Sequence, residues 1–113
     1  MAYLTKEIYL MEVQSAIIVW CTVPDQATAE MLAKETLKEK ITTCVTILPH
    51  VKSIYLWENN IVTSDELQML FKGNACHQQE LFKLIKKLHP YKLPEIFSIL
   101  IDSGEAKYLT WLY

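Results

Sequence analysis

The chain has 113 residues, of which 51% are hydrophobic, and this combination predicts a single domain with a substantial core. Its net charge is −2, from 11 basic and 13 acidic residues, and every basic residue is a lysine. Arginine supplies most base reading and phosphate clamping, and an acidic domain lacks the field that gathers a polyanion, so nucleic acid is excluded as a partner.

Cysteine usage and hydropathy indicate a reduced setting away from membranes. The 3 cysteines, Cys21, Cys44 and Cys76, are odd in number and widely spaced, which indicates neither a disulfide framework nor a zinc knuckle. The longest wholly apolar run, residues 16–21, is too short to span a bilayer. We therefore expect a cytoplasmic protein with no membrane partner.

The first residues differ from the remainder of the chain. Residues 1–12 follow no clear hydrophobic period and carry charged side chains where an export signal would be apolar. We treat residues 1–12 as an N-terminal tail and residues 13–113 as one domain.

A strand and a helix are predicted at the start of this domain. Residues 15–22 are nearly continuously apolar and rich in β-branched side chains, which is typical of a central strand buried on both faces. Asp25 can cap a helix that follows, with lysines toward its C-terminal end. The inward-facing residues expected on this helix are Ala29, Leu32, Ala33, Thr36 and Leu37.

A long hairpin comes next. Residues 43–58 alternate along one arm, Asn59 and Asn60 tolerate the positive φ of a tight turn, and a second alternating arm follows. Such an arm reaches roughly 40 Å or more, whereas a compact domain of this size has a radius of gyration of about 13 Å. The tip must project or bend. Tyr55 and Trp57 are therefore predicted to be buried against another subunit, with stacking on a small ligand as the alternative.

The last third of the chain predicts a helix, a strand and a short helix. Asn74 can cap the first helix and Pro90 ends it, residues 96–101 read as another mostly apolar strand, and residues 105–112 can form the closing helix. The side chains expected to point inward are Leu81, Leu84, Ile85 and Leu88 in the first helix, and Tyr108, Leu109 and Leu112 in the second.

This element order is β-α-β-β-α-β with a final helix, and it predicts an α+β, ferredoxin-like fold. The sheet is expected to be antiparallel with strand order 4-1-3-2 and both main helices on one face. In that order Cys21, His89 and Glu95 arrive at the same end of the sheet, whereas Cys44 and Cys76 lie at the other end. A thiolate, an imidazole and a carboxylate suit a borderline metal, and Cu²⁺ leads the affinity order of divalent ions.

Structural roles for the same three residues remain open at this point. Cys21 can be a small apolar residue at a strand end, because free cysteines are often buried and inert. His89 can simply finish its helix, with its charge favoured by the helix dipole, and Glu95 can accept backbone N–H groups in the loop.

Several motifs follow one another along nearly the whole chain, from about residue 15 to 111. They are Cys21-Thr22-Val23-Pro24-Asp25, Ile41-Thr42-Thr43-Cys44-Val45, Ser53-Ile54-Tyr55-Leu56-Trp57-Glu58, His89-Pro90-Tyr91-Lys92-Leu93-Pro94-Glu95 and Tyr108-Leu109-Thr110-Trp111. In these motifs and their order the chain resembles the CutA divalent-cation-tolerance family. Glycines that the family often has are His50 and Asn60 here, which affects the expected shape of the loops.

The resemblance implies a homotrimer that binds copper or another divalent cation and contributes to metal tolerance, without being an enzyme. It implies Cys21, His89 and Glu95 as the metal-binding positions and no catalytic residue. An alternative is a signalling or scaffold trimer like the PII proteins, which binds a small ligand or a partner protein in clefts between subunits. A small hydrolase of the acylphosphatase type fits poorly, because the chain has no arginine and only 2 glycines for a phosphate cradle.

Overall fold

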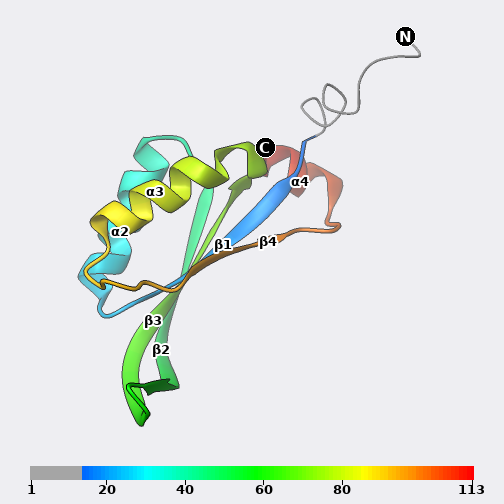
Figure 1. The fold of residues 1–113 in the computed structure, drawn as a ribbon. Helices are drawn as coiled ribbons and strands as arrows, with labels where there is room; N and C mark the ends of the chain where they lie inside the picture. The colour runs from blue at the N-terminus through cyan, green and yellow to red at the C-terminus, as the bar shows by residue number, and fades with distance from the viewer. Residues whose placement is uncertain (1–13) are drawn as a thin grey trace, which may run out of the picture.

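The computed structural model describes residues 14–113, so the predicted tail, residues 1–12, lies outside the described residues. The helices and strands follow the predicted order (Figure 1). They are β1 (Ala16–Val23), α2 (Gln26–Lys38), β2 (Cys44–Trp57), β3 (Asn60–Asn74), the 3₁₀ helix η1 (Ala75–His77), α3 (Gln78–Leu88), β4 (Ile96–Leu100) and α4 (Ala106–Leu112).

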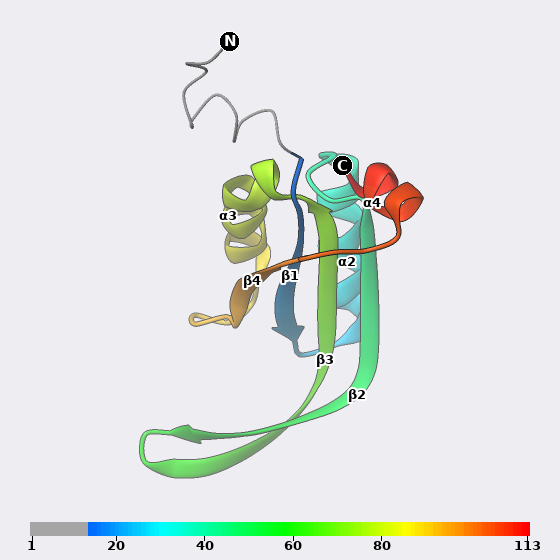
Figure 2. The same cartoon turned by 90° about the vertical axis from the view of Figure 1, so that its right-hand side faces the viewer.

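The 4 strands form one antiparallel sheet in the order β2-β3-β1-β4. This is the predicted order 4-1-3-2 counted from the opposite edge, and α2 and α3 both lie on one face of the sheet (Figures 1 and 2). The prediction of an α+β, ferredoxin-like fold is therefore confirmed. Because β1 lies antiparallel beside β4, its C-terminal end meets the loop of residues 89–95, which leaves α3 and enters β4.

The core lies between the sheet and the two helices. Alternate residues of β1, from Ile17 to Val23, point toward α2 and α3 and are at most 2% exposed. The opposite face of β1 is less covered than predicted, because Ile18 and Trp20 are only half-buried and Trp20 stacks on Phe97 with 6.2 Å between ring centroids. Neither α2 nor α3 covers this second face, and the short helix α4 contacts mainly β3 rather than β1, which explains the difference (Figure 2).

The two main helices start close to their predicted caps. Asp25 accepts a hydrogen bond from the backbone N–H of Thr28 at 2.8 Å and begins α2 as predicted. Asn74 instead caps the short helix η1. The main helix α3 begins only at Gln78, directly after η1, and has no side-chain cap. Leu37, predicted to point inward, is 41% exposed because it lies in the last turn of α2, where that helix ends at the edge of the core.

The hairpin turn lies one residue earlier than predicted. Its positive-φ residues are Glu58 and Asn59, at 49° and 66°, whereas Asn60 already pairs with Trp57 as the first residue of β3. Two successive positive φ angles are typical of a type I′ hairpin turn. A bulge between Leu48 and Val51, where His50 has φ 58°, interrupts the register of β2 next to Pro49.

Beyond the body of the sheet the hairpin bends sharply to one side (Figure 2). The molecule measures 58 × 29 × 26 Å, with a radius of gyration of 16.4 Å. A compact domain of about 100 residues has a radius of gyration of about 13 Å, so this molecule is more extended than a compact domain of its size. The projecting hairpin accounts for the difference. Ile54, Leu56 and Ile61 are 67%, 73% and 77% exposed there.

The closing helix α4 has only seven residues and buries one of them fully. Leu112 is 0% exposed, and its carbonyl accepts a hydrogen bond from the Thr43 hydroxyl at 2.9 Å. Tyr108, predicted to point inward, is 42% exposed and packs against Trp111 with the two ring planes tilted by 40°. Residues three apart share a helix face, so Tyr108 and Trp111 turn outward together when Leu109 and Leu112 face the sheet. Within residues 14–113 no helix has the length and apolar character needed to cross a bilayer.

Candidate functional site

Thr22, near the end of β1, is the residue on which the predicted site residues meet. Nε2 of His89 lies 2.8 Å from the Thr22 backbone carbonyl oxygen, and the Thr22 hydroxyl donates to Oε2 of Glu95 at 2.6 Å. His89 directly follows α3 and Glu95 directly precedes β4, so both ends of the single loop of residues 89–95 are attached to the same residue of β1. The end of β1, His89 and Glu95 therefore lie at the same end of the sheet, where the strand order predicted them.

Cys21 lies next to this residue but in a different environment. Its side chain is 0% exposed in the core, opposite Met69 of β3 and Ile96 of β4. Burial, with a smaller contribution from the Glu95 carboxylate, raises the pKa of the Cys21 thiol from an ordinary 9.0 to about 12. At neutral pH the sulfur is therefore a thiol, whereas a metal ligand must be a thiolate.

The thiol and the carboxylate lie on opposite faces of β1. Side chains of consecutive strand residues alternate between the faces, and Cys21 points toward the helices. Thr22 points the other way and holds Glu95 there. In the part of the chain that the structure describes, no three His, Cys, Asp or Glu side chains form a group that could hold a metal ion.

Both ring nitrogens of His89 are engaged. A carbonyl oxygen only accepts, so Nε2 carries the proton and donates to Thr22, while Nδ1 accepts the backbone N–H of Tyr91 at 3.1 Å. The ring is 7% exposed. In this arrangement His89 is a neutral imidazole with no free lone pair, so binding a metal requires one of these two hydrogen bonds to break.

The three predicted ligands thus fit copper by their chemistry but not by their arrangement in one chain. Sulfur, nitrogen and oxygen donors are those that Cu²⁺ and Zn²⁺ accept. Only Glu95 is exposed and has capacity for further partners, since a carboxylate can accept about four hydrogen bonds. Cys44, which pairs with Lys72, and Cys76, which follows β3, lie at the far end of the sheet as predicted.

Glu66 is a residue of this region that the sequence did not single out. It was expected only as one member of the alternating pattern of the second hairpin arm, but it is 8% exposed and Oε2 accepts the Tyr91 hydroxyl at 2.8 Å. Partial desolvation and the negative charge of Glu66 raise the pKa of the Tyr91 phenol above its ordinary 10.0. The sequence did contain one signal of this role. Glu66 is a carboxylate in the middle of β3, at the point where the strand leaves the core and enters the hairpin.

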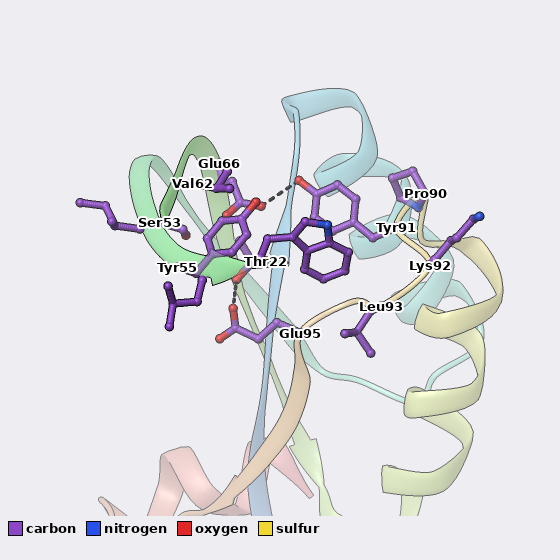
Figure 3. A pocket seen from close by; sticks show the side chains of 13 residues that line it. Thr22, Ser53, Tyr55, Val62, Glu66, Pro90, Tyr91, Lys92, Leu93 and Glu95 are labelled. Carbon is purple, nitrogen blue, oxygen red and sulfur yellow. Dashed lines mark hydrogen bonds between the residues drawn. The ribbon is translucent and has the colours of Figure 1, made fainter. Parts of the chain in front are cut away.

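A cavity of about 950 Å³ opens beside these contacts, between the bent hairpin and the loop of residues 90–95 (Figure 3). Residues 53–57 of the hairpin form one wall, and Pro90, Tyr91 and Leu93 form the other. Glu66 and Glu95 contribute the carboxylates. The region therefore combines aromatic surface with negative charge.

Comparison with known proteins gives consistent results. The family described as "CutA1 divalent ion tolerance protein" matches residues 17–113. A divalent-cation tolerance protein CutA of Yersinia pestis (strain Pestoides F) is 46% identical over 98 residues, which cover 87% of this chain and 82% of the relative.

Two solved structures extend this likeness to the fold. The divalent cation tolerance protein from Thermus thermophilus is 37% identical, with a TM-score of 0.83 over 86% of this chain and 94% of that chain. The periplasmic divalent cation tolerance protein CutA from Archaeoglobus fulgidus is 32% identical, with the same TM-score over 86% and 94% of the two chains.

Proposed function

The chain belongs to the CutA1 divalent ion tolerance family, and on that premise we propose that it binds divalent cations, copper foremost, and contributes to metal-ion tolerance as a homotrimer. The observation that supports the binding is the meeting of the His89 and Glu95 side chains on Thr22, beside Cys21. The family is named for tolerance rather than for a reaction, which supports a protein that is not an enzyme.

We propose Cys21, His89 and Glu95 as the metal-binding residues, with the ion as exchangeable cargo. Glu95 is exposed and is the donor that an arriving cation meets first. His89 must release either the Tyr91 N–H or the Thr22 carbonyl oxygen, and Cys21 must lose its proton. These costs favour reversible binding over a permanently loaded site.

Two separate apolar surfaces support a homotrimer. One is the sheet face opposite α2 and α3, with Trp20 and Phe97 on it, and the other is the hairpin tip, on which Leu56 and Ile61 are exposed. Exposed apolar patches of this kind mark contacts with other chains. When two different surfaces of one chain contact each other between copies, the copies can close into a ring, for which the family resemblance suggests three members.

We propose a cytoplasmic location. Cys21, Cys44 and Cys76 are all free thiols, which a reducing compartment preserves. The relative from Archaeoglobus fulgidus is described as periplasmic, so fractionation of cells that express this chain is the direct check.

Calorimetric titration of the reduced protein with Cu²⁺ and Zn²⁺ under anaerobic conditions tests the proposed ligands. We expect Cys21→Ala, His89→Ala and Glu95→Gln each to weaken binding by about tenfold or more. The matched controls are Cys76→Ala and His50→Ala, which remove the same donor types elsewhere and should bind as the unsubstituted chain does. Unchanged affinity in all three site variants would refute the ligand set.

Sedimentation of the same samples tests the assembly. We expect a species of three chains at micromolar concentration, because the two apolar surfaces are too large to remain in water. A monomer at that concentration contradicts the homotrimer.

A further inference from the structure

The two sides of the hairpin tip carry different side chains. Along β2, Ile54 and Leu56 alternate with Tyr55 and Trp57, and adjacent residues of a strand point to opposite faces. Tyr55 pairs across the hairpin with Val62, and both line the cavity between the hairpin and the 90–95 loop. Ile54 and Leu56 are also part of the lining, so this segment of β2 contributes both aromatic and aliphatic surface to the cavity.

Aromatic rings lie on both walls of this cavity. Tyr55 and Trp57 belong to the hairpin wall. Tyr91 belongs to the loop wall, across from Tyr55 (Figure 3). Their exposed fractions are 41%, 52% and 36%, so none of the three is committed to the core. Three such rings around one space provide π faces that attract a cation as well as an apolar body.

The charge in the cavity is negative. Glu66 and Glu95 line it, and each is fixed by one hydrogen bond from a hydroxyl, at 2.8 Å from Tyr91 and 2.6 Å from Thr22. Each carboxylate therefore keeps acceptor capacity for a ligand. Lys92 is the basic residue of the lining, and it extends away from both carboxylates (Figure 3). An anion is disfavoured in this field.

Within the lining itself a metal ion finds only two carboxylates, Glu66 and Glu95, and Glu95 is also one of the proposed ligands of the metal site. In the described part of the chain no three potential ligands form a metal-holding group. A volume of about 950 Å³ is that of a small-molecule site rather than of an ion site. Aromatic walls, two fixed acceptors and this volume together favour an organic cation.

We propose that this cavity binds a small organic amine, with its ammonium group donating to Glu66 and Glu95 and its apolar body against Tyr55, Trp57 and Tyr91. A primary ammonium has three N–H donors, so one ammonium group can donate a hydrogen bond to each of two carboxylates at the same time.

Three probes of one size and different charge test the inference by calorimetry on the full chain. They are 2-phenylethylammonium, the neutral 2-phenylethanol and the anionic phenylacetate. We expect the ammonium to bind about tenfold or more tightly than the alcohol, and the anion not to bind. Equal binding of the ammonium and the alcohol, or no binding of the ammonium at millimolar concentration, would overturn the proposal.

Variants distinguish this site from the proposed metal site. Glu66→Gln and Trp57→Leu should each weaken the ammonium by about fivefold or more, while Cu²⁺ binding is retained, since neither residue is a proposed metal ligand. Glu58→Gln in the turn and Trp111→Leu in α4 are matched controls outside the cavity and should bind the amine normally. Trp57 is half-exposed, so we expect Trp57→Leu to fold. It therefore remains a test of the inference if the substitution of the buried Glu66 disturbs folding. Amine affinity that is unchanged in Trp57→Leu contradicts the inference.

Discussion

The two halves of β3 show how one alternating strand can serve two purposes. Residues 67–74 pair with β1 on one side and lie under the helices, and Met69 and Phe71 are 0% exposed. Residues 60–65 pair with β2 alone, and Ile61 is 77% exposed. The pattern in the sequence is similar in both halves. Only the first half has a third strand and a helix layer next to it, so the apolar residues of the second half need a partner from outside the chain.

The largest expected effect separates these halves by stability. Phe71→Ala should lower the free energy of unfolding by about 3–5 kcal/mol, because it leaves a cavity in the core. Ile61→Ala, its counterpart in the hairpin, should lower it only through assembly, so its cost should shrink as the protein is diluted. Urea denaturation of both variants at two protein concentrations measures this. A cost of Ile61→Ala that does not change with concentration would mean that the hairpin is stabilised within one chain.

The next effect concerns the thiol of Cys21 in β1, which pairs with Met69 in the covered half of β3. With a pKa of about 12 instead of 9.0, the thiolate fraction of Cys21 at pH 8 is about a thousandfold lower than that of an ordinary cysteine. Cys21 should therefore react with iodoacetamide at least about a thousandfold more slowly than an unburied thiol, and its rate should rise with pH up to about 12. Exposed Cys76 is the internal control, followed by peptide mass spectrometry. Equal labelling of both in the folded protein would contradict the placement of Cys21 in the core.

The topology was predictable because hydrophobic periodicity identified each strand and helix, and an antiparallel order fixes which strand ends meet. That argument brought Cys21, His89 and Glu95 to one end of the sheet and kept Cys44 away from them. It did not distinguish the two faces of the sheet. The alternation along β1 places Cys21 and Thr22 on opposite sides, so the donors share a sheet end without sharing a point in space.

Other features depended on tertiary structure. The burial of Glu66 follows from the bend of the hairpin, which brings the strand next to Tyr91, and no local pattern specifies that bend. The turn shifted to Glu58 and Asn59 because Trp57 and Asn60 pair across the hairpin, although glutamate is an unusual residue at positive φ. In both places the contacts across the hairpin outweighed the preference of single residues.

The smallest effect tests the junction between the two halves of β3. Tyr91→Phe removes the donor to Glu66 and should cost about 1–2 kcal/mol, because a mostly buried carboxylate loses its partner. Tyr55→Phe removes a hydroxyl whose hydrogen bond with Ser64 is open to solvent, and it should cost less than about 0.5 kcal/mol. Amide hydrogen exchange should rise in residues 60–66 of the first variant and not of the second.

The pH dependence of the same contact has a definite sign. The pKa of the Tyr91 phenol is raised in the folded chain, so its contribution to stability is complete below pH 10 and is lost as the pH rises above that value. The difference in unfolding free energy between the unsubstituted chain and Tyr91→Phe should therefore be constant from pH 7 to about 9.5 and should fall at higher pH. A difference that already disappears near pH 8 would show that the phenol does not donate to Glu66. In that case the hairpin would be held against the loop by packing alone, and the boundary between the covered and the uncovered half of β3 would not depend on this hydrogen bond.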